Sequence, residues 1–177
     1  MVKVNVGCGK RNWSSEGWIS VDGADFPHVT NNDVSLKWMD NDSVDIIVAS
    51  HLIAYFDHND AVSILKEWLR VLKHGGVLHI STPNMYVISK LIADGMQLKY
   101  ALGPVYGRAY GDGHKVGYDY LSMIILLGIA GFTNIEIYDH RTTCHPNTGN
   151  REDYYDDHSA AYIEGTLISL NVQATKP

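Results

Sequence analysis

Short apolar runs separated by polar segments mark the predicted strands in the first part of the chain. The runs Lys3–Val6, Trp18–Asp22 and Val44–Ser50 contain many β-branched residues, which is typical of strands buried in a parallel sheet. Thr30–Val34 predicts a further short edge strand. The links that follow the first three strands are too short for good crossover helices.

A helical pattern comes next, with apolar residues spaced three and four positions apart. Its apolar face consists of Ala61, Ile64, Leu65, Trp68, Leu69 and Leu72. Asp57 is placed to cap the start of this helix, and Gly75 is placed to end it. The sequence therefore predicts a helix over Asp60–Lys73.

Two further elements and two long segments are predicted in the middle of the chain. Val77–Thr82 predicts a strand, and Met85–Asp94 predicts a helix. Residues 95–118 are rich in glycine and tyrosine and predict a long functional loop. The polar segment Asp139–Glu164 predicts an excursion on the surface.

A very apolar helix and two strands are predicted in the last part of the chain. Asp119 can cap a helix over Tyr120–Ala130, and Gly131 can end it. Two strands, Thr133–Tyr138 and Gly165–Thr175, follow. The order of elements predicts an α/β fold with a mostly parallel sheet and an antiparallel strand pair at its C-terminal end.

The predicted helices are reduced on one face of this sheet. Asp60–Lys73 and Tyr120–Ala130 would both cover the same face, leaving strands rich in valine and isoleucine open on the other. A parallel sheet does not tolerate such exposure in water. We therefore expect self-association, most simply a homodimer, or cover by the segments 95–118 and 139–164.

Composition narrows the class of protein. Of the 177 residues, 45% are hydrophobic and 19% charged, which fits one globular domain over 1–177. The net charge is −6 and there is no basic stripe, so a nucleic-acid partner is not expected. No apolar run is long enough to span a membrane. The two cysteines are far apart in sequence, so we expect a cytoplasmic protein without disulfides.

A glycine turn, Gly7-Cys8-Gly9, follows directly after the first predicted strand. Glycines allow a close approach between backbone and ligand at the carboxyl end of a parallel strand. A dinucleotide fingerprint would need a third glycine where this chain has Asn12, so a nicotinamide oxidoreductase is a weaker reading. A purely structural turn is the other alternative. Asp22, which ends the second strand, could accept both hydroxyls of a ribose and favours a nucleoside ligand.

Motifs along nearly the whole chain resemble the class I S-adenosylmethionine (SAM)-dependent methyltransferases, and in particular a subgroup of small predicted methyltransferases. The segments that carry the resemblance are Val4–Gly9, Gly17–Asp22, Asp42–Asp45, Ser50-His51, Leu65–Gly76, Thr82–Asn84, Gly131-Phe132 and Ser169–Val172. The resemblance implies a Rossmann-like methyltransferase sheet and SAM as the cofactor.

The resemblance also implies roles for individual residues. Gly7, Cys8 and Gly9 would line the methionine and ribose parts of the cofactor, and Asp22 would hold the ribose hydroxyls. Further cofactor contacts would come from Asp33 near the adenine amino group and from Ser50 and His51 at the methionine end. For Asp33, a carboxylate that only stabilises a turn is an equal alternative.

Four positions depart from the family pattern. The family usually has an acidic residue at Asn5 and often a third glycine at Arg11. Close relatives often carry Glu-His where this chain has Ala54-Tyr55. These departures leave open the alternative of a non-catalytic SAM-binding protein with the same fold.

Methyl transfer is an in-line displacement in which the protein mainly positions the acceptor and excludes water. An oxygen or nitrogen acceptor on a small molecule or glycan-like substrate also needs a base of near-neutral pKa. His51 and His114 are the candidate bases, with Tyr110 and Tyr118 as walls or hydrogen-bond partners. A solvated loop histidine is the simpler reading of His114.

The polar segment Asp139–Glu164 allows two further interpretations. Three of its histidines, His140, His145 and His158, follow acidic or cysteine residues, but their spacing matches no usual zinc arrangement, so no metal site is expected. Tyr154 and Tyr155 could form a lid over the acceptor site.

Overall fold

Six strands form one mixed sheet in the order β2-β1-β3-β4-β8-β5. This computed structural model describes residues 1–107, 113–143 and 161–177. The strands β2, β1, β3 and β4 run parallel, whereas β8 is antiparallel to both β4 and β5. Their bounds are Lys3–Val6 (β1), Trp18–Val21 (β2), Val44–Ser50 (β3), Leu72–Pro83 (β4), Thr133–Ile137 (β5) and Ser169–Thr175 (β8). The predicted fold class, including the antiparallel C-terminal pair, is confirmed.

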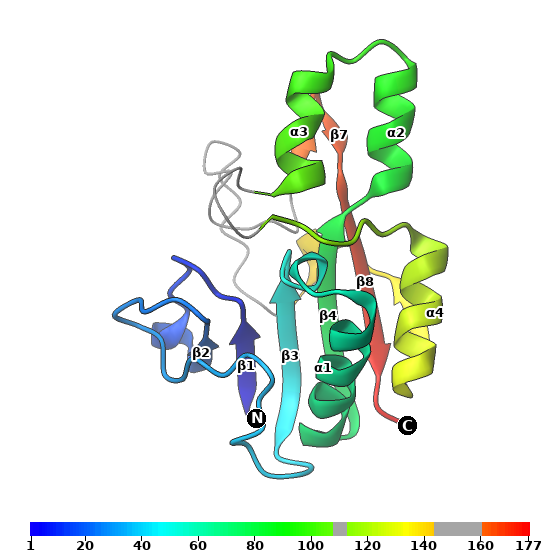
Figure 1. The fold of residues 1–177 in the computed structure, drawn as a ribbon. Coiled ribbons are helices and arrows are strands. Elements are labelled where there is room, and N and C mark those ends of the chain that lie inside the picture. The colour runs from blue at the N-terminus through cyan, green and yellow to red at the C-terminus, as the bar shows by residue number, and fades with distance from the viewer. Residues whose placement is uncertain (108–112, 144–160) are drawn as a thin grey trace.

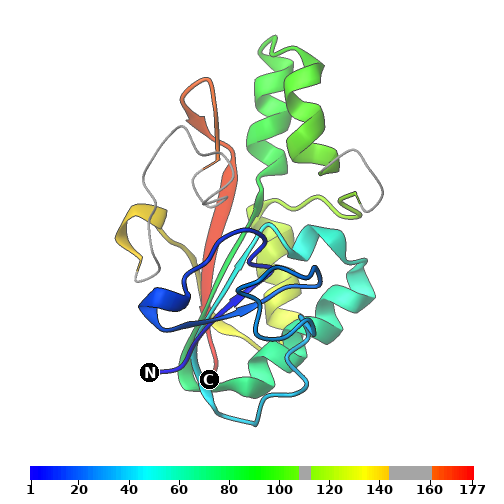
Figure 2. The same cartoon turned by 90° about the vertical axis from the view of Figure 1, so that its left-hand side faces the viewer.

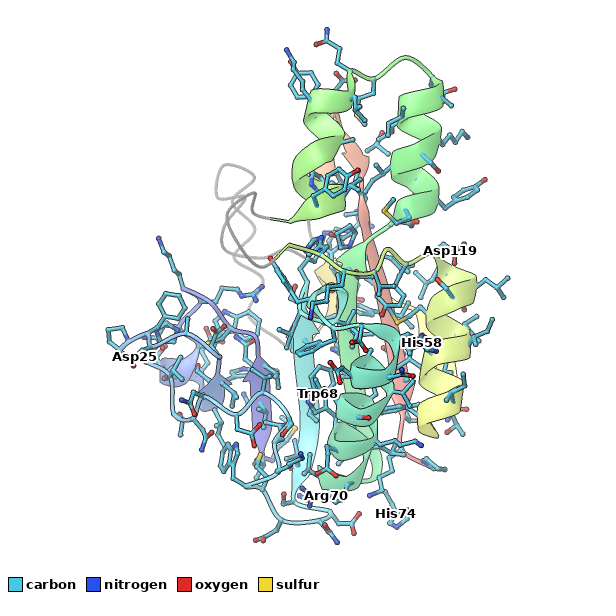
Figure 3. The ribbon with its side chains drawn as sticks, viewed as in Figure 1. Asp25, His58, Trp68, Arg70, His74 and Asp119 are labelled. Carbon is cyan, nitrogen blue, oxygen red and sulfur yellow. The ribbon has the colours of Figure 1, made fainter. Side chains whose placement is uncertain are left out.

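The predicted edge strand over Thr30–Val34 is wrong. Only Asn31 makes an isolated bridge, to Val21 at the end of β2. The chain that follows is instead held on the first helix, because the Trp68 indole N–H donates to the Val34 carbonyl at 2.8 Å. The Arg70 guanidinium adds bonds to the carbonyls of Leu36 and Met39. Figure 3 labels both anchoring side chains on this helix, α1.

Two strand boundaries also differ from expectation. β4 begins at Leu72, directly after α1, rather than at Val77. The predicted strand Gly165–Thr175 is divided, because Thr166–Leu167 (β7) pairs with Tyr162–Ile163 (β6) in a separate hairpin. Strand β8 begins only after Ile168, whose side chain is buried against the helical hairpin described below.

The two helices that cover the sheet begin where their N-terminal caps predict them, although α1 ends at Val71 and the predicted stop at Gly75 lies inside β4. In α1 (His58–Val71), the Asp57 side chain accepts the N–H groups of Asn59 and Asp60, each at 3.0 Å. In α4 (Tyr120–Ala130), Asp119 and Ser122 form a reciprocal capping box. Figure 3 labels Asp119 at the start of this helix.

Both helices pack on the same face of the sheet, as Figure 2 shows in side view. The core between them and the strands includes Val4, Val6, Ile47, Ala49, Leu78, Ile80 and Val172 from the sheet, Leu65 and Trp68 from α1, and Met123 and Leu127 from α4. No helix in the described ranges is long and apolar enough to cross a membrane.

The opposite face of the sheet is not the valine- and isoleucine-rich surface that was expected. Strand alternation places polar residues there, in cross-strand rows. One row joins Asn5 to Ser20, and the row nearer the carboxyl ends joins Ser81 to Ser50 and Asn171. A small cluster around Trp13 and Trp18 covers part of this face near the short helix η1 (Ser14–Glu16). Because the face is largely polar, the original reason for expecting a homodimer is removed, and self-association stays a prediction.

A helical hairpin lies beyond the carboxyl ends of the strands, as Figure 1 shows. Its first helix, α2 (Met85–Ala93), matches the expectation, but residues 95–118 contain a second helix, α3 (Leu98–Tyr106), where a loop was predicted. Pro104 lies inside α3. Ala101 of α3 is fully buried with Ile88 of α2. Tertiary packing therefore outweighs the weak helix propensity of this segment.

Candidate functional site

The glycine turn lies where β1 ends, beside the end of β2. Gly7 and Gly9 have φ values of +68° and +54°, which side-chain-bearing residues rarely adopt. The Gly7 and Cys8 N–H groups donate to the Val21 carbonyl at 2.8 and 3.2 Å. A Cβ on Gly7 would lie 3.0 Å from the Leu52 side chain, whereas one on Gly9 would meet open space. The turn is thus a close-packed cradle on one side and open on the other.

Asp22 lies directly after β2 and shapes the same turn. Its carboxylate accepts the N–H of Gly9 at 2.6 Å and that of Ala24 at 2.9 Å. A carboxylate has about four acceptor positions, so two neutral hydroxyls can still bind to it. Asp22 is therefore held by the turn it supports and keeps capacity for a ligand.

One cavity of about 500 Å³ extends from this turn to the ends of α3 and β3. Its described lining includes most of the predicted site residues: Gly7, Cys8, Gly9, Asp22, Ser50, His51 and His114. The structure adds others that sequence reasoning missed, namely Lys10, Arg11, Ala24, Phe26, Leu52, Tyr55, Gly103, Pro104, Gly107, Ala161 and Ile168. Segments that are far apart in the sequence therefore meet around one space.

The Cys8 thiol is buried within the cofactor turn. Burial raises the pKa of the thiol to about 11, with the charge of Asp22 acting in the same direction and that of Arg11 opposing it. The thiol thus stays protonated at neutral pH and is a poor nucleophile. Cys8 contributes shape rather than reactivity.

His51 lies just after β3 in a left-handed conformation, with φ of +55°. Its N–H donates to the Ser81 carbonyl at 2.8 Å, and its Nε2 lies 3.0 Å from Ser169 Oγ at the start of β8. Strained backbone of this kind persists only where surrounding contacts fix it. The ring is therefore held at the cavity by two strands.

His114 is fixed by the C-terminal end of α3. Its Nδ1 lies 3.1 Å from the Pro104 carbonyl oxygen, and its ring meets Tyr55 edge-on at 4.7 Å between centroids. Because a carbonyl only accepts, Nδ1 carries the proton, and Nε2 keeps its lone pair in the neutral ring. Burial lowers the pKa of His114, so the imidazole is neutral at pH 7. These features are those of a general base.

Two sequence-based candidates, Asp33 and Tyr118, are not part of the described cavity lining, and three others lie outside the described residues. Asp33 is outside the lining, where its carboxylate accepts the N–H and hydroxyl of Ser35 in a turn. Tyr118 is buried away from the lining, and burial raises the pKa of its phenol to about 12. Tyr110 and the lid pair 154–155 lie outside the described residues.

Two of the three histidines considered as metal ligands lie outside the described residues, and the third is His140. His140 is buried next to Asp139, with 3.9 Å between Nδ1 and Oδ1. His145 and His158 lie outside the described residues. Among the residues that are described, no three histidine, cysteine or acidic side chains are placed to hold a metal ion.

Comparisons with known proteins agree with this architecture. Residues 15–80 match a family model described as a methyltransferase domain, a segment that contains Asp22, Ser50 and His51. No curated protein sequence matches the chain.

Solved structures share the fold at low sequence identity. A SAM-dependent methyltransferase from Archaeoglobus fulgidus is 18% identical, with a TM-score of 0.62 over 98% of this chain and 85% of that one. A 1,6-didemethyltoxoflavin-N1-methyltransferase from Burkholderia thailandensis is 15% identical, with a TM-score of 0.61 over 99% and 70%. A possible exported protein from Bordetella parapertussis is 18% identical, with a TM-score of 0.59 over 99% of this chain; this chain spans 61% of its length.

The fold is thus that of the class I SAM-dependent methyltransferases. The match over residues 15–80 to a methyltransferase-domain model agrees with the resemblance seen in the sequence, which implies SAM as the cofactor and methyl transfer as the reaction. The residues present fit that cofactor, because the open glycine cradle and the spare acceptor capacity of Asp22 face one cavity.

Proposed function

We propose that this chain transfers a methyl group from SAM to an oxygen or nitrogen atom of a small molecule. The observation that carries the proposal is the single cavity joining the glycine turn and Asp22 to two oriented histidines. When bound, SAM supplies an electrophilic methyl group. The residues of this chain then need only hold the acceptor in line, exclude water and remove a proton.

The cofactor end of the cavity is assigned to Gly7, Cys8, Gly9 and Asp22. Asp22 would accept the ribose hydroxyls while it continues to accept the Gly9 and Ala24 N–H groups. Ser50 and His51 lie at the end of β3 on the same cavity and are assigned to the methionine end. Asp33 near the adenine stays a prediction with less support, because it is not part of the described cavity lining.

The acceptor end is assigned to the space around His114. Its Nε2 would take the proton of the acceptor hydroxyl or amine, because Nδ1 is already donating to Pro104. Tyr55, Leu52 and Ile168 line the same cavity and would exclude water from the acceptor. His51 is the second candidate base, with its Nε2 beside Ser169.

The alternative of a non-catalytic SAM-binding protein rests on Asn5, Ala54 and Tyr55, which depart from the family pattern. Asn5 is fully buried and is not part of the described lining. Ala54 is buried too and also lies outside that lining, and its backbone carbonyl accepts the N–H groups of Lys115 and Val116. Tyr55 does line the cavity, at the position where relatives often carry a histidine. The alternative therefore depends mainly on Tyr55.

The test has two steps. Isothermal titration calorimetry with SAM and with S-adenosylhomocysteine measures cofactor binding, and absence of binding would refute both the enzyme and the non-catalytic alternative. Transfer of labelled methyl from SAM is then measured across a panel of phenols, amines, carboxylic acids and simple glycans. Transfer to an oxygen or nitrogen acceptor, abolished by His114→Gln, is the expected result. Binding without transfer to any acceptor would favour the non-catalytic protein.

Two properties stay predictions without structural support of their own. A homodimer would be detected as a doubled mass in light scattering. The exposed apolar side chains of α4, Leu121, Ile125 and Ile129, are the described residues whose substitution by serine would be expected to weaken it. A cytoplasmic location would be checked by fractionation.

A further inference from the structure

The backbone carbonyl groups of the glycine turn are hydrogen-bonded by side chains. Its three N–H groups donate to β2 and Asp22, as described above. Its three carbonyl oxygens accept hydrogen bonds from side chains, and the Cys8 oxygen also accepts the backbone N–H of Arg11 at 3.0 Å. The Gly7 and Cys8 carbonyls receive bonds from Arg11, and the Gly9 oxygen lies 3.1 Å from His28 Nε2. Every polar backbone atom of the turn is therefore paired.

Arg11 makes the shortest of these carbonyl contacts. Its Nη2 donates to the Gly7 oxygen at 2.7 Å and its Nε to the Cys8 oxygen at 3.0 Å. The side chain is 6% exposed, so this is a built interaction and not a surface contact. A planar guanidinium holds its donors to two successive carbonyls in one fixed geometry, whereas a lysine ammonium is a point charge on a flexible stem.

This arrangement compensates for a missing helix. In nucleotide-binding α/β folds the glycine turn usually opens a crossover helix, whose first turn fixes the loop geometry. Here the link between β1 and β2 contains only the three-residue helix η1, which begins at Ser14. The turn at residues 7–9 must therefore be fixed by something other than helix hydrogen bonds. Arg11, at the position where relatives often have a third glycine, is placed to do this.

We propose that Arg11 is the positioning residue of the cofactor turn. Its guanidinium ties the Gly7 and Cys8 carbonyls together below the turn, which keeps the Gly9 N–H on Asp22 and the open side of Gly9 toward the cavity. The turn is then preorganised for its ligand without a helix. The identification of the ligand as SAM rests on the proposed function. The role of Arg11 in fixing the turn does not depend on it.

The experiment compares Arg11→Lys with Arg141→Lys. Arg11→Lys keeps the charge but loses the planar two-carbonyl bridge, whereas Arg141→Lys makes the same exchange at an exposed arginine outside the described cavity lining. Calorimetry with S-adenosylhomocysteine is expected to show affinity reduced by about tenfold or more in Arg11→Lys and little changed in Arg141→Lys. Unchanged affinity in Arg11→Lys would show that the positive charge alone is sufficient and would overturn the proposal.

Amide hydrogen exchange of the ligand-free protein provides the readout that does not depend on the cofactor. Arg11→Lys is expected to speed exchange at the amides of Gly7, Cys8 and Gly9 while the β4–β8 pair stays protected. Unchanged exchange at the turn, or faster exchange throughout the sheet, would overturn the positioning role. If the wild-type protein binds no S-adenosylhomocysteine, the proposed function fails, and the exchange result still decides the role of Arg11.

Discussion

The glycine turn and Asp22, which form the ribose side of the cofactor end, are close in sequence, whereas residues from distant segments form the acceptor end. The glycine turn and Asp22 are joined by a 2.6 Å hydrogen bond across 13 residues. His114, in contrast, depends on Pro104 of α3 and on Tyr55, which is 59 positions away in the sequence (114 − 55). The first end is fixed by the sheet, and the second by the helical hairpin that lies beyond the strand ends.

This difference predicts that variants at the two ends fail in different ways. Changes at the cofactor end should alter the affinity for SAM. Changes at the acceptor end should alter the rate of transfer and leave cofactor affinity unchanged.

The largest effect is expected for His114→Gln, which removes the proposed base. Loss of general-base catalysis typically lowers the rate by about 100-fold or more, so kcat should fall on this scale while the affinity for S-adenosylhomocysteine stays the same. The control is His74→Gln, an exposed histidine far from the cavity (Figure 3). A drop in kcat of the same size in both variants would contradict the assignment.

The pH dependence of the transfer rate tests the same role of His114 as the base. Burial lowers the pKa of His114 in the ligand-free protein, so the neutral base persists below its ordinary value of about 6.5, and the acid limb of kcat/KM should lie below that pH. As pH falls below about 6.5, the unfolded chain takes up the proton first, so folding loses stability in acid. Urea unfolding between pH 7 and pH 5 should show less of this loss in His114→Gln than in wild type.

At the cofactor end, Asp22→Ala is expected to weaken S-adenosylhomocysteine binding by on the order of 100-fold. The change removes the acceptor for the ribose hydroxyls and for the Gly9 and Ala24 N–H groups, and hydrogen bonds to charged groups are the stronger kind. Asp25→Asn changes an exposed carboxylate in the same loop (Figure 3) and should bind normally. Calorimetry measures both, and normal binding by Asp22→Ala would remove Asp22 from the site.

A smaller effect, on stability, separates the two glycines of the turn. Gly7→Ala and Gly9→Ala both place a side chain at positive φ, at a cost of about 1–2 kcal/mol each. Gly7→Ala also brings a Cβ within 3.0 Å of Leu52, which should add about 1–3 kcal/mol of overpacking. Urea unfolding should therefore rank Gly7→Ala as the less stable. Equal free energies of unfolding for the two variants would show that the Leu52 side chain moves aside without a loss of stability.

The smallest effect is expected for a variant outside the cavity, in the cap of α4. Asp119→Ala removes the capping box of α4 and should lower the free energy of unfolding by about 1 kcal/mol. Neither cofactor affinity nor kcat should change, because α4 packs on the far face of the sheet from the polar rows. A loss of cofactor affinity in this variant would show that the site and the scaffold are coupled.

The same contrast explains how much could be predicted from the sequence. The cofactor end carries local signals, namely a glycine turn after an apolar run and an acid at the end of the next strand, so Gly7, Gly9 and Asp22 could be found. Caps at Asp57 and Asp119 likewise marked both covering helices.

The acceptor end carries no comparable local signal. Helix α3 contains Gly103 and Pro104 and forms because Ala101 packs on α2, a contact that no local pattern predicts. The wall residues Tyr55 and Gly107 were missed for the same reason. Arg11 was noticed only as a departure from a glycine pattern, because its bonds to backbone carbonyls have no sequence signature.

A crystal structure with S-adenosylhomocysteine bound tests the central claim most directly. The account predicts ribose hydroxyls on Asp22 and the cofactor sulfur in the cavity, with free space between it and His114 Nε2. A nucleoside bound elsewhere, or a sulfur facing away from the space around His114 and His51, would contradict the account.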